Sequence, residues 1–525
     1  MPLKPLKHGR ERSQSRSKFE KYARLLLLLL SACGGQSRAK APPGGVVVII
    51  PREPEQLDPR YVGDAYGLKV TRLLHASLLR IHPFTLEPVP ELAESVNIES
   101  PVRYRVTLRP GLAFSDGSPL DAADVVATYR GLVDPAVKSR YVSTFARIRR
   151  VEALSPREVV FELDAPHATF LTDLEMPVLR AEDALVPAEP GRVPLGAGAY
   201  SLRERSQGTL VLSANPHYHA RPVAHPELKL VVIHDDNTRA MRMLAGGGDL
   251  ALNTIPPLLL SLFDRPGFRV QSERGVGTTY IGINLEHPLL GDLRVRRALA
   301  HAIDRRGLVE HKLFGRAALA SSWIAPSHWA HAAETPTYDY DPARARALLE
   351  EAGIKTTAAE PTLALTVRTS SDRAVISLAR ALASMLRDVG IDLDVRPSET
   401  ATLLADLTRG RFELTLLQSP EVIEPHVLSW FFASERIPNP GKSEGANRWR
   451  IRSTELDQAL ELGRAHVERE VRVAAYRRVQ QLLAEQLPVI PLWHEDVVAV
   501  TSARLPHFRV PRDSRFGTIA LERQP

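Results

Sequence analysis

A single cysteine, Cys33, stands in a chain of 525 residues, so no disulfide can form within the fold. A large protein without such cross-links takes its stability from buried apolar surface, and a chain of this length can bury more than one core. At roughly 100–200 residues per domain, the length predicts about two to four domains. The 41 prolines indicate many loops and short elements.

The residues before Cys33 have the features of an export signal with a lipid attachment site. An unbroken leucine run, Leu25–Leu30, leads into Ser31 and Ala32, and the stretch 30–33 reads as a bacterial lipobox. The run is too short to span a bilayer, which takes about 20 apolar residues. We therefore expect residues 1–32 to be a signal peptide, Cys33 to carry lipid, and residues 33–45 to form a flexible linker. The alternative is a chance leucine-rich stretch with a buried free cysteine.

Most of the positive charge of the chain lies in that signal. Residues 1–32 hold eight Lys and Arg and two acids, which gives +6 of the +7 of the whole chain. The rest of the chain therefore carries only about +1. This excludes the strongly basic body that is typical of a nucleic-acid-binding protein.

Apolar spacing along the body predicts a mixed α/β fold. The β-branched run Val46–Ile50 predicts a buried strand, and Arg294–Leu313 has the spacing of one long amphipathic helix. A strand at Leu363–Val367, a helix at Ala374–Val389 and a strand at Ile391–Val395 predict a βαβ unit with two parallel strands.

Five blocks of the sequence carry a family signature. They are Leu57–Pro59 with Tyr104–Gly111, Phe114–Pro119 and Asp124–Val126; Gly196–Tyr200 with Asn215–Tyr218; Arg294–Leu299 with Ala302–Arg305; Tyr338–Pro342; and Pro488–Leu492. In this order the blocks resemble the family 5 extracellular solute-binding proteins, the dipeptide, oligopeptide and nickel receptors of ABC importers. Any one block alone is weak evidence for this family, whereas five blocks in this order are specific to it.

The resemblance implies a type II periplasmic-binding-protein fold, in which two α/β lobes are joined by a hinge and an extra domain is inserted in the first lobe. The strand expected at Val489–Trp493 would return the chain to the first lobe. The implied boundaries are 43–79, 196–277 and 489–525 for the first lobe, 80–195 for the inserted domain and 278–488 for the second lobe.

The resemblance also implies where the two charges of a peptide would bind. In peptide-binding relatives, an acid in the segment matched here by Gln418–Pro425 holds the ligand amine, and Glu421 falls at that offset with one extra methylene. Arg368 follows the strand Leu363–Val367, where dipeptide-binding relatives place an arginine for the ligand carboxylate. A guanidinium pairs with a carboxylate through two hydrogen bonds. A solvated loop acid and a surface arginine are the alternatives.

Two further positions match parts of the cleft in relatives. Asp64, Ala65 and Tyr66 match a first-lobe loop that lines the cleft through main-chain contacts, and a helix cap is the alternative. Tyr280 lies at the expected crossing between the lobes, near the hinge, where an aromatic ring can face the cleft. Packing within its strand is the alternative.

The catalytic and metal-binding motifs in the sequence are incomplete. Ser115 stands in Ala113–Gly117, which lacks the first glycine of a nucleophile elbow. His494 begins only half of a zinc-helix motif. His217 and His219 offer two metal ligands without a third. We therefore expect no enzyme activity, no cofactor and no metal site.

These features predict the substrate-binding lipoprotein of an ABC importer, a monomer on the periplasmic side of a bacterial envelope. Cys33 would attach it to the lipid bilayer, and the permease would be its partner. The ligand would be a peptide or a related small solute. The same fold with a nickel chelate, an oligosaccharide or an opine stays open, and a secreted hydrolase is the alternative from another class.

Overall fold

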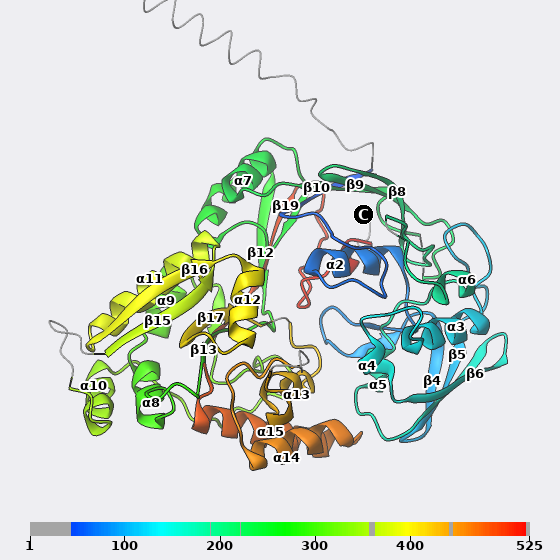
Figure 1. Ribbon diagram of the computed structural model, residues 1–525. Helices are drawn as coiled ribbons and strands as arrows, with labels where there is room; N and C mark the ends of the chain where they lie inside the picture. Colours follow the sequence, from blue (N-terminus) through cyan, green and yellow to red (C-terminus); the bar gives the residue numbers. More distant parts are fainter. Residues whose placement is uncertain are drawn as a thin grey trace, which may run out of the picture. The chain divides into compact units, whose positions relative to one another are not determined.

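The computed structural model describes residues 44–189, 191–220, 222–355, 363–419, 421–439 and 445–520. The predicted signal peptide, Cys33 and nearly all of the linker lie outside these residues. Within the described part of the chain, no helix combines the length and the apolar character that crossing a bilayer requires. The residues from Gly44 onward form one compact unit with two large mixed sheets (Figure 1).

The first large sheet is the centre of the first lobe. The predicted strand Val46–Ile50 is confirmed as β1, and all five of its residues are buried, as expected for a β-branched run inside a sheet. It runs parallel to both of its neighbours, β10 (Glu227–Val232) and β11 (Leu250–Leu252). In order across the sheet, the strands are β12 (Phe268–Glu273), β19 (Val497–Ser502), β11 (Leu250–Leu252), β1, β10 (Glu227–Val232), β9 (Thr209–Ala214) and β8 (Tyr200–Ser206).

The second large sheet is the centre of the second lobe. The predicted βαβ unit is confirmed, because β15 (Leu363–Ser370) and β16 (Ile391–Ser398) pair in parallel and α11 (Arg373–Arg387) connects them. Leu382 and Leu386 of α11 are buried in the same core as the sheet. In order, the strands are β14 (Ala317–Leu319), β18 (Val489–Glu495), β13 (Thr279–Ile283), β17 (Leu414–Gln418), β15 (Leu363–Ser370) and β16 (Ile391–Ser398).

The return of the chain to the first lobe occurs later than we expected. Val489–Trp493 belongs to β18, which pairs antiparallel with β13 in the second sheet, with Ile490 opposite Ile281. The chain enters the first sheet only with β19, after Asp496. Both strands are rich in buried apolar residues, and Asp496 alone separates them. The apolar pattern therefore does not tell which sheet each strand joins.

A smaller antiparallel sheet lies within residues 80–195, and α3 (Ala122–Val133) packs on it. Tyr129 of this helix makes edge-to-face contacts with Phe145 and Phe161 in a core of its own. The sheet has the order β4 (Ala93–Ser100), β5 (Arg103–Leu108), β7 (Glu158–Leu163) and β6 (Ile148–Ser155). Beside it lie the hairpin β2 (Leu79–Ile81) and β3 (Pro88–Pro90) and the short helices α4 (Val142–Phe145), α5 (Phe170–Asp173) and α6 (Ala181–Ala184).

The long helix predicted at Arg294–Leu313 is two helices, α8 (Leu293–His301) and α9 (Arg305–Lys312). Asp304 breaks the run because its carboxylate accepts a hydrogen bond of 2.8 Å from the backbone N–H of Gly307 and so caps α9. The remaining helices are α2 (Ala65–Leu74), α7 (Asp236–Leu244), α10 (Pro342–Glu351), α12 (Thr400–Thr408), α13 (Val427–Phe432), α14 (Thr454–Ala465), α15 (Arg469–Gln486) and α16 (Gly517–Ala520).

Candidate functional site

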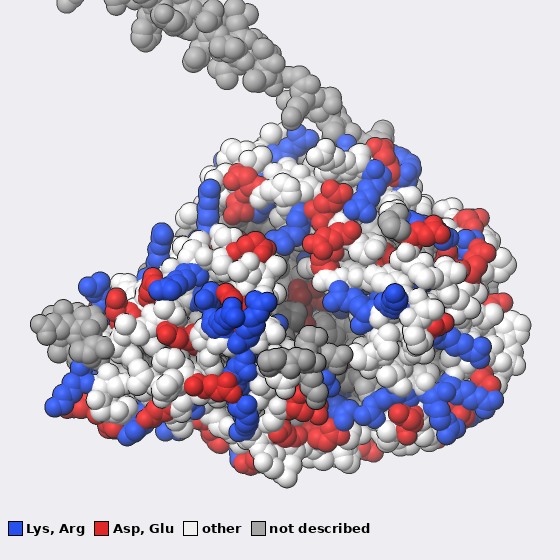
Figure 2. Space-filling view, viewed as in Figure 1, with Lys and Arg blue, Asp and Glu red and all other residues white. Residues whose placement is uncertain are grey.

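The face drawn in Figure 2 is hollowed between α2 on one side and α12 on the other. A cavity of about 280 Å³ lies where three parts of the chain meet. Because each part contributes side chains, a solute held there would touch the first lobe, the inserted segment and the second lobe together. The polar and aromatic lining comprises Thr71 and Arg72 of α2, Tyr141, Thr144, Phe145, Thr172, Asp173 and Glu175 of the inserted segment, and His426 beside α13.

Charges on the wall of this cavity are tightly paired. Arg72 donates a hydrogen bond of 3.1 Å to Glu175, and Arg515 from the C-terminal segment also pairs with this carboxylate. Burial favours the neutral form of Glu175, but Arg515 and Arg72 outweigh burial and hold its pKa below the ordinary value. Glu175 is therefore an ionised acid between two arginines, and it gives the wall fixed charges of both signs.

His426 is a cleft residue that the sequence analysis did not single out. It lines this cavity and a second one of about 690 Å³, which extends along α13 and α14. Burial, as the largest cause, lowers the pKa of His426 to about 4, so the imidazole is neutral at pH 7. Its Nδ1 atom has no hydrogen-bond partner among the residues that the structure describes. The short run from Glu424 to His426, just beyond the expected amine-binding acid, was the available signal.

A neutral imidazole can accept a hydrogen bond from a ligand or coordinate a metal ion. A metal held by the protein alone would need more ligands than this one side chain. Within the described ranges, no group of three or more His, Cys, Asp or Glu side chains could hold a metal ion. Any metal bound at His426 would therefore have to bring most of its ligands with it.

Glu421 and Tyr66, both predicted site residues, lie within electrostatic range of one another and are linked through Lys69 and Ser514. Glu421 is exposed, and its Oε1 accepts a hydrogen bond of 2.9 Å from the Ser514 hydroxyl. That hydroxyl accepts one of 2.9 Å from Lys69 of α2. Burial is the main reason that the pKa of Tyr66 rises to about 12, and the charge of Glu421 adds to the rise. Lys69 and Ser514 were missed by sequence reasoning, although Lys69 lies one helical turn after Tyr66.

Asp64 and Ala65 begin α2. The carboxylate of Asp64 caps the helix by accepting hydrogen bonds of 2.7 Å from the Gly67 N–H and 3.2 Å from the Glu55 N–H. Ala65 is exposed as the first helical residue. The side chain of Asp64 thus has the capping role that the sequence left as the alternative, and main-chain contacts of Asp64 and Ala65 with a ligand stay a prediction.

Arg368 and Tyr280 have partners within the second lobe. Arg368 donates to Asp406 of α12 at 2.9 Å, and the two side chains are 27% and 17% exposed. Tyr280 packs against Trp323 and Trp449, with ring centroids 4.2 Å and 5.5 Å away, and is only 2% exposed. Strand packing, the alternative for Tyr280, describes this position. A ligand role for Arg368 would require its carboxylate partner to be shared or exchanged.

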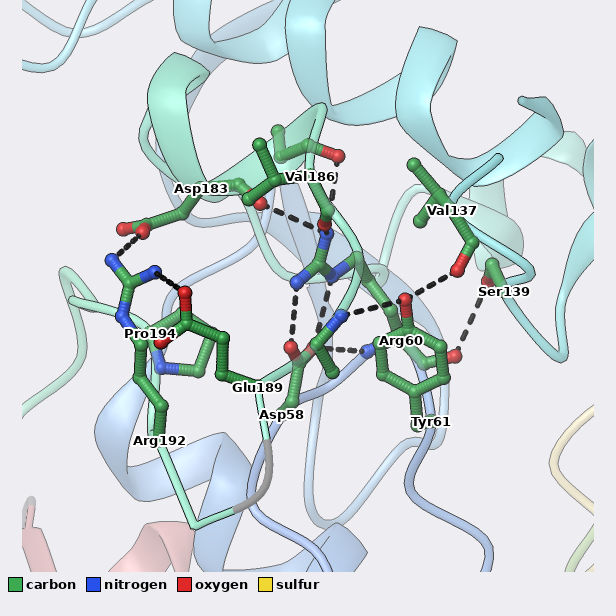
Figure 3. A network of polar contacts seen from close by, with 12 residues as sticks. Asp58, Arg60, Tyr61, Val137, Ser139, Asp183, Val186, Glu189, Arg192 and Pro194 are labelled. Carbon is green, nitrogen blue, oxygen red and sulfur yellow. Dashed lines mark hydrogen bonds and ion pairs between the residues drawn. The ribbon is translucent and has the colours of Figure 1, made fainter. Parts of the chain in front are cut away.

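The motif Leu57–Pro59 has a structural role at the junction of the first lobe and the inserted segment. Asp58 and Arg60 form a buried ion pair of 2.6 Å, and they are 1% and 2% exposed. The guanidinium also donates to three carbonyl groups of the inserted segment, as Figure 3 shows in part. These carbonyls, at 2.9, 3.2 and 2.6 Å, belong to Asp183, Ala184 and Val186. We call Asp58 and Arg60 with these carbonyls the arginine hub.

Known proteins with similar chains are solute-binding proteins. A di/tripeptide-binding protein of Pseudomonas aeruginosa is 26% identical over 513 residues, which cover 90% of this chain and 93% of the relative. The nickel-binding periplasmic protein of Escherichia coli is 25% identical, over 79% of this chain and 83% of the relative.

A solved structure extends the likeness to the fold. NikZ from Campylobacter jejuni, solved in complex with Ni(L-His), is 25% identical with a TM-score of 0.79, and the match covers 92% of this chain and 99% of NikZ. The mixed α/β architecture is thus the two-lobed type II periplasmic-binding-protein fold. The family model described as bacterial extracellular solute-binding proteins, family 5 Middle, matches residues 87–437. The chain belongs to this family of extracellular solute-binding proteins.

Proposed function

We propose that the protein is the substrate-binding component of an ABC importer and captures a peptide or peptide-like solute between its lobes. The observation that carries the proposal is the cavity lined by α2, by the inserted segment and by His426 of the second lobe. A solute bound there makes contacts with both lobes only when they are closed, so binding energy favours the closed form. The closed form would then be what the permease recognises.

The chemistry of the wall suits a peptide. A peptide group carries one hydrogen-bond donor and one acceptor, and both must be satisfied when the group leaves water. The wall offers the ionised pair of Arg72 and Glu175, the hydroxyls of Thr144 and Tyr141, and the neutral imidazole of His426. Binding needs no bond to be cleaved, and we propose a receptor without catalytic activity.

A thermal-shift assay with pooled peptides of two to five residues tests this function. We expect the melting temperature to rise with peptide concentration, because a ligand that binds only the folded state stabilises it. Thr144→Trp, which fills the cavity, should abolish the rise. Its neighbour Ser143 is exposed and does not line the cavity, so Ser143→Trp should preserve it. No rise with any pool, or loss of the rise in both variants, would count against a peptide bound in this cavity.

A metal chelate is the second candidate ligand, and the observation that favours it is the buried Nδ1 atom of His426, which has no hydrogen-bond partner among the described residues and belongs to a cavity-lining side chain. A chelate such as nickel bound by free histidine brings its own ligands and needs only one more from the protein. Titration with Ni²⁺ and L-histidine should then show tight binding that His426→Ala removes. His466, whose side chain is 46% exposed, provides the control His466→Ala. If both variants bind the chelate equally, His426 is not its ligand.

We further propose that lipid on Cys33 anchors the mature protein to the envelope membrane as a monomer. A tether raises the local concentration of the receptor near its permease. Expression of the full chain in a bacterium with labelled palmitate should give a labelled protein in the membrane fraction. Cys33→Ser should remain unlabelled. Label on the Cys33→Ser chain would contradict this attachment site.

A further inference from the structure

The carboxylate of Glu421 already has a cation of the protein beside it. Ser514, which is 2% exposed, accepts a hydrogen bond from the Lys69 ammonium and donates one to Glu421, both of 2.9 Å. One hydroxyl thus links the ammonium of the first lobe to the acid of the second lobe. A hydroxyl can donate and accept at once, so this relay leaves neither charge without a partner.

Lys69 is held in place by its surroundings. Its Nζ atom lies 5.3 Å from the centroid of the Tyr66 ring and 5.7 Å from that of Phe516, within the range of cation–π attraction. Burial, the largest cause, lowers the pKa of Lys69, and the charge of Glu421 is the strongest influence in the opposite direction. Glu421 is therefore the main counter-charge of this ammonium.

A second cation beside Glu421 would meet repulsion. Arg515 also lies within electrostatic range of this acid, although its own hydrogen bonds go to Glu175. A ligand ammonium at Glu421 would thus have to share one carboxylate with Lys69 and enter a region that already holds Arg515. A ligand ammonium and these two protein cations would repel one another, most strongly where water is partly excluded.

We infer that Lys69 occupies the place of a ligand ammonium and that the solute end beside Glu421 is uncharged, as in a peptide with a blocked amino terminus. This inference rests on the proposed peptide function and names its substrate class. It concerns a solute that extends beyond the cavity at Glu175, because Glu421, Lys69 and Ser514 are not among the residues that line this cavity. Lys69 is a specificity-determining residue in this view, because it determines whether a charged ligand end can bind beside Glu421. Glu421 would hold Lys69 through the Ser514 hydroxyl and would not bind a ligand amine.

The test is a capture experiment with the full chain of the protein. An equimolar pool of random peptides of two to five residues, half with free amino termini and half N-acetylated, is offered to the protein, and the bound peptides are quantified by mass spectrometry. We expect the wild type to show less than about a threefold preference for free amines, far below the loss of an unpaired charge. Lys69→Met should shift the ratio toward free amines by about tenfold or more, because Glu421 then lacks its cation.

A matched control removes a lysine with the same kind of hydrogen bond at a position away from Glu421. Lys312 also donates to a serine hydroxyl, that of Ser377 at 2.9 Å, in an exposed position on α9. Lys312→Met should leave the capture ratio unchanged. A wild-type preference for free amines above about threefold, or a smaller shift in Lys69→Met, overturns the inference while leaving the peptide function intact. Capture of neither half of the pool overturns the peptide function and the inference with it. If Lys69→Met does not fold, the wild-type ratio alone decides.

Discussion

The arginine hub and the Lys69–Ser514–Glu421 relay join different parts of the molecule in different ways. In the hub, the guanidinium of a fully buried first-lobe ion pair donates hydrogen bonds to three carbonyl groups of the inserted segment. The relay joins the first lobe to the second through two hydrogen bonds that share one hydroxyl, and its acid is exposed. One junction excludes water, whereas water can reach the other.

This difference matters for a protein whose lobes must separate. Opening the hub would break three hydrogen bonds from the Arg60 guanidinium and leave polar groups without partners, which costs about 1–3 kcal/mol for each one that stays buried. Opening the relay breaks the one hydrogen bond from Ser514 to Glu421 and returns an exposed carboxylate to water, where it is well solvated. The first lobe and the inserted segment should therefore move together, and closure should occur between this pair and the second lobe.

The largest effect is expected at the hub. Arg60→Ala leaves Asp58 buried without its cation and frees three carbonyl groups, so the free energy of unfolding should fall by about 3–5 kcal/mol. Chemical denaturation measures this change. The control Arg396→Ala removes an arginine whose pair with Asp394 is exposed on both sides, and it should change stability by less than about 0.5 kcal/mol. Equal effects in the two variants would contradict the proposed difference between the junctions.

Two glycines extend the comparison to the backbone. A Cβ at Gly196 would lie 2.0 Å from the carbonyl oxygen of Leu74, so Gly196→Ala should destabilise the protein by about 1–3 kcal/mol. At Gly277, near the crossing into the second lobe, a Cβ would meet only the Ser419 oxygen at 3.4 Å. Gly277→Ala should therefore change the unfolding free energy by less than about 1 kcal/mol. The comparison fails if Gly277→Ala is the more harmful substitution.

A pH effect is expected at Glu91, an inserted-segment acid that accepts a hydrogen bond from Ser77 of the first lobe. Burial is the main cause that raises the pKa of Glu91 from 4.5 to about 7, with Ser77 donating to its carboxylate at 2.8 Å. Arg80 and Arg72 lower this pKa and Glu175 raises it. The folded state therefore binds the proton more tightly, so this group makes the protein less stable as pH rises from about 4.5 to about 7.

Glu91→Gln should remove this contribution. The stability difference between the variant and the wild type should increase with pH across that window, by on the order of 1–2 kcal/mol in favour of the variant. Denaturation curves at pH 4.5, 5.5, 6.5 and 7.5 measure it. A difference that is constant with pH would show that Glu91 titrates as an ordinary carboxyl group.

The sequence predicted those features that depend on local pattern. Apolar spacing sufficed to predict β1 and the βαβ unit, because the spacing of apolar residues within a short segment indicates whether it is a strand or a helix and which side is buried. It failed at Arg294–Leu313, where the capping preference of Asp304 outweighed the helical spacing, and at Val489–Trp493, where two adjacent apolar strands join different sheets. Strand pairing is a tertiary choice that such a pattern does not encode.

The candidate site was predicted less completely, for the same reason. Glu421 and Tyr66 were identified through resemblance, and the structure brings them near one another. Lys69 and Ser514 complete their environment from positions 445 residues apart, so no local pattern links them. Tyr280 has an aromatic type suited to a cleft, but three-dimensional packing places it between two tryptophans.

The smallest effect on stability, and the sharpest test of the loose junction, is expected at Ser514. This residue has a φ of 50°, a left-handed conformation that glycine adopts more readily. Ser514→Ala removes the hydroxyl and keeps the strain, whereas Ser514→Gly removes both. Neither should change the unfolding free energy by more than about 1 kcal/mol.

Because both break the link between Lys69 and Glu421, both should enlarge the radius of gyration of the ligand-free protein in small-angle X-ray scattering. An enlargement in Ser514→Gly alone would assign it to the change in backbone strain, and a loss of stability as large as that of Arg60→Ala would mean that the two junctions are equally rigid.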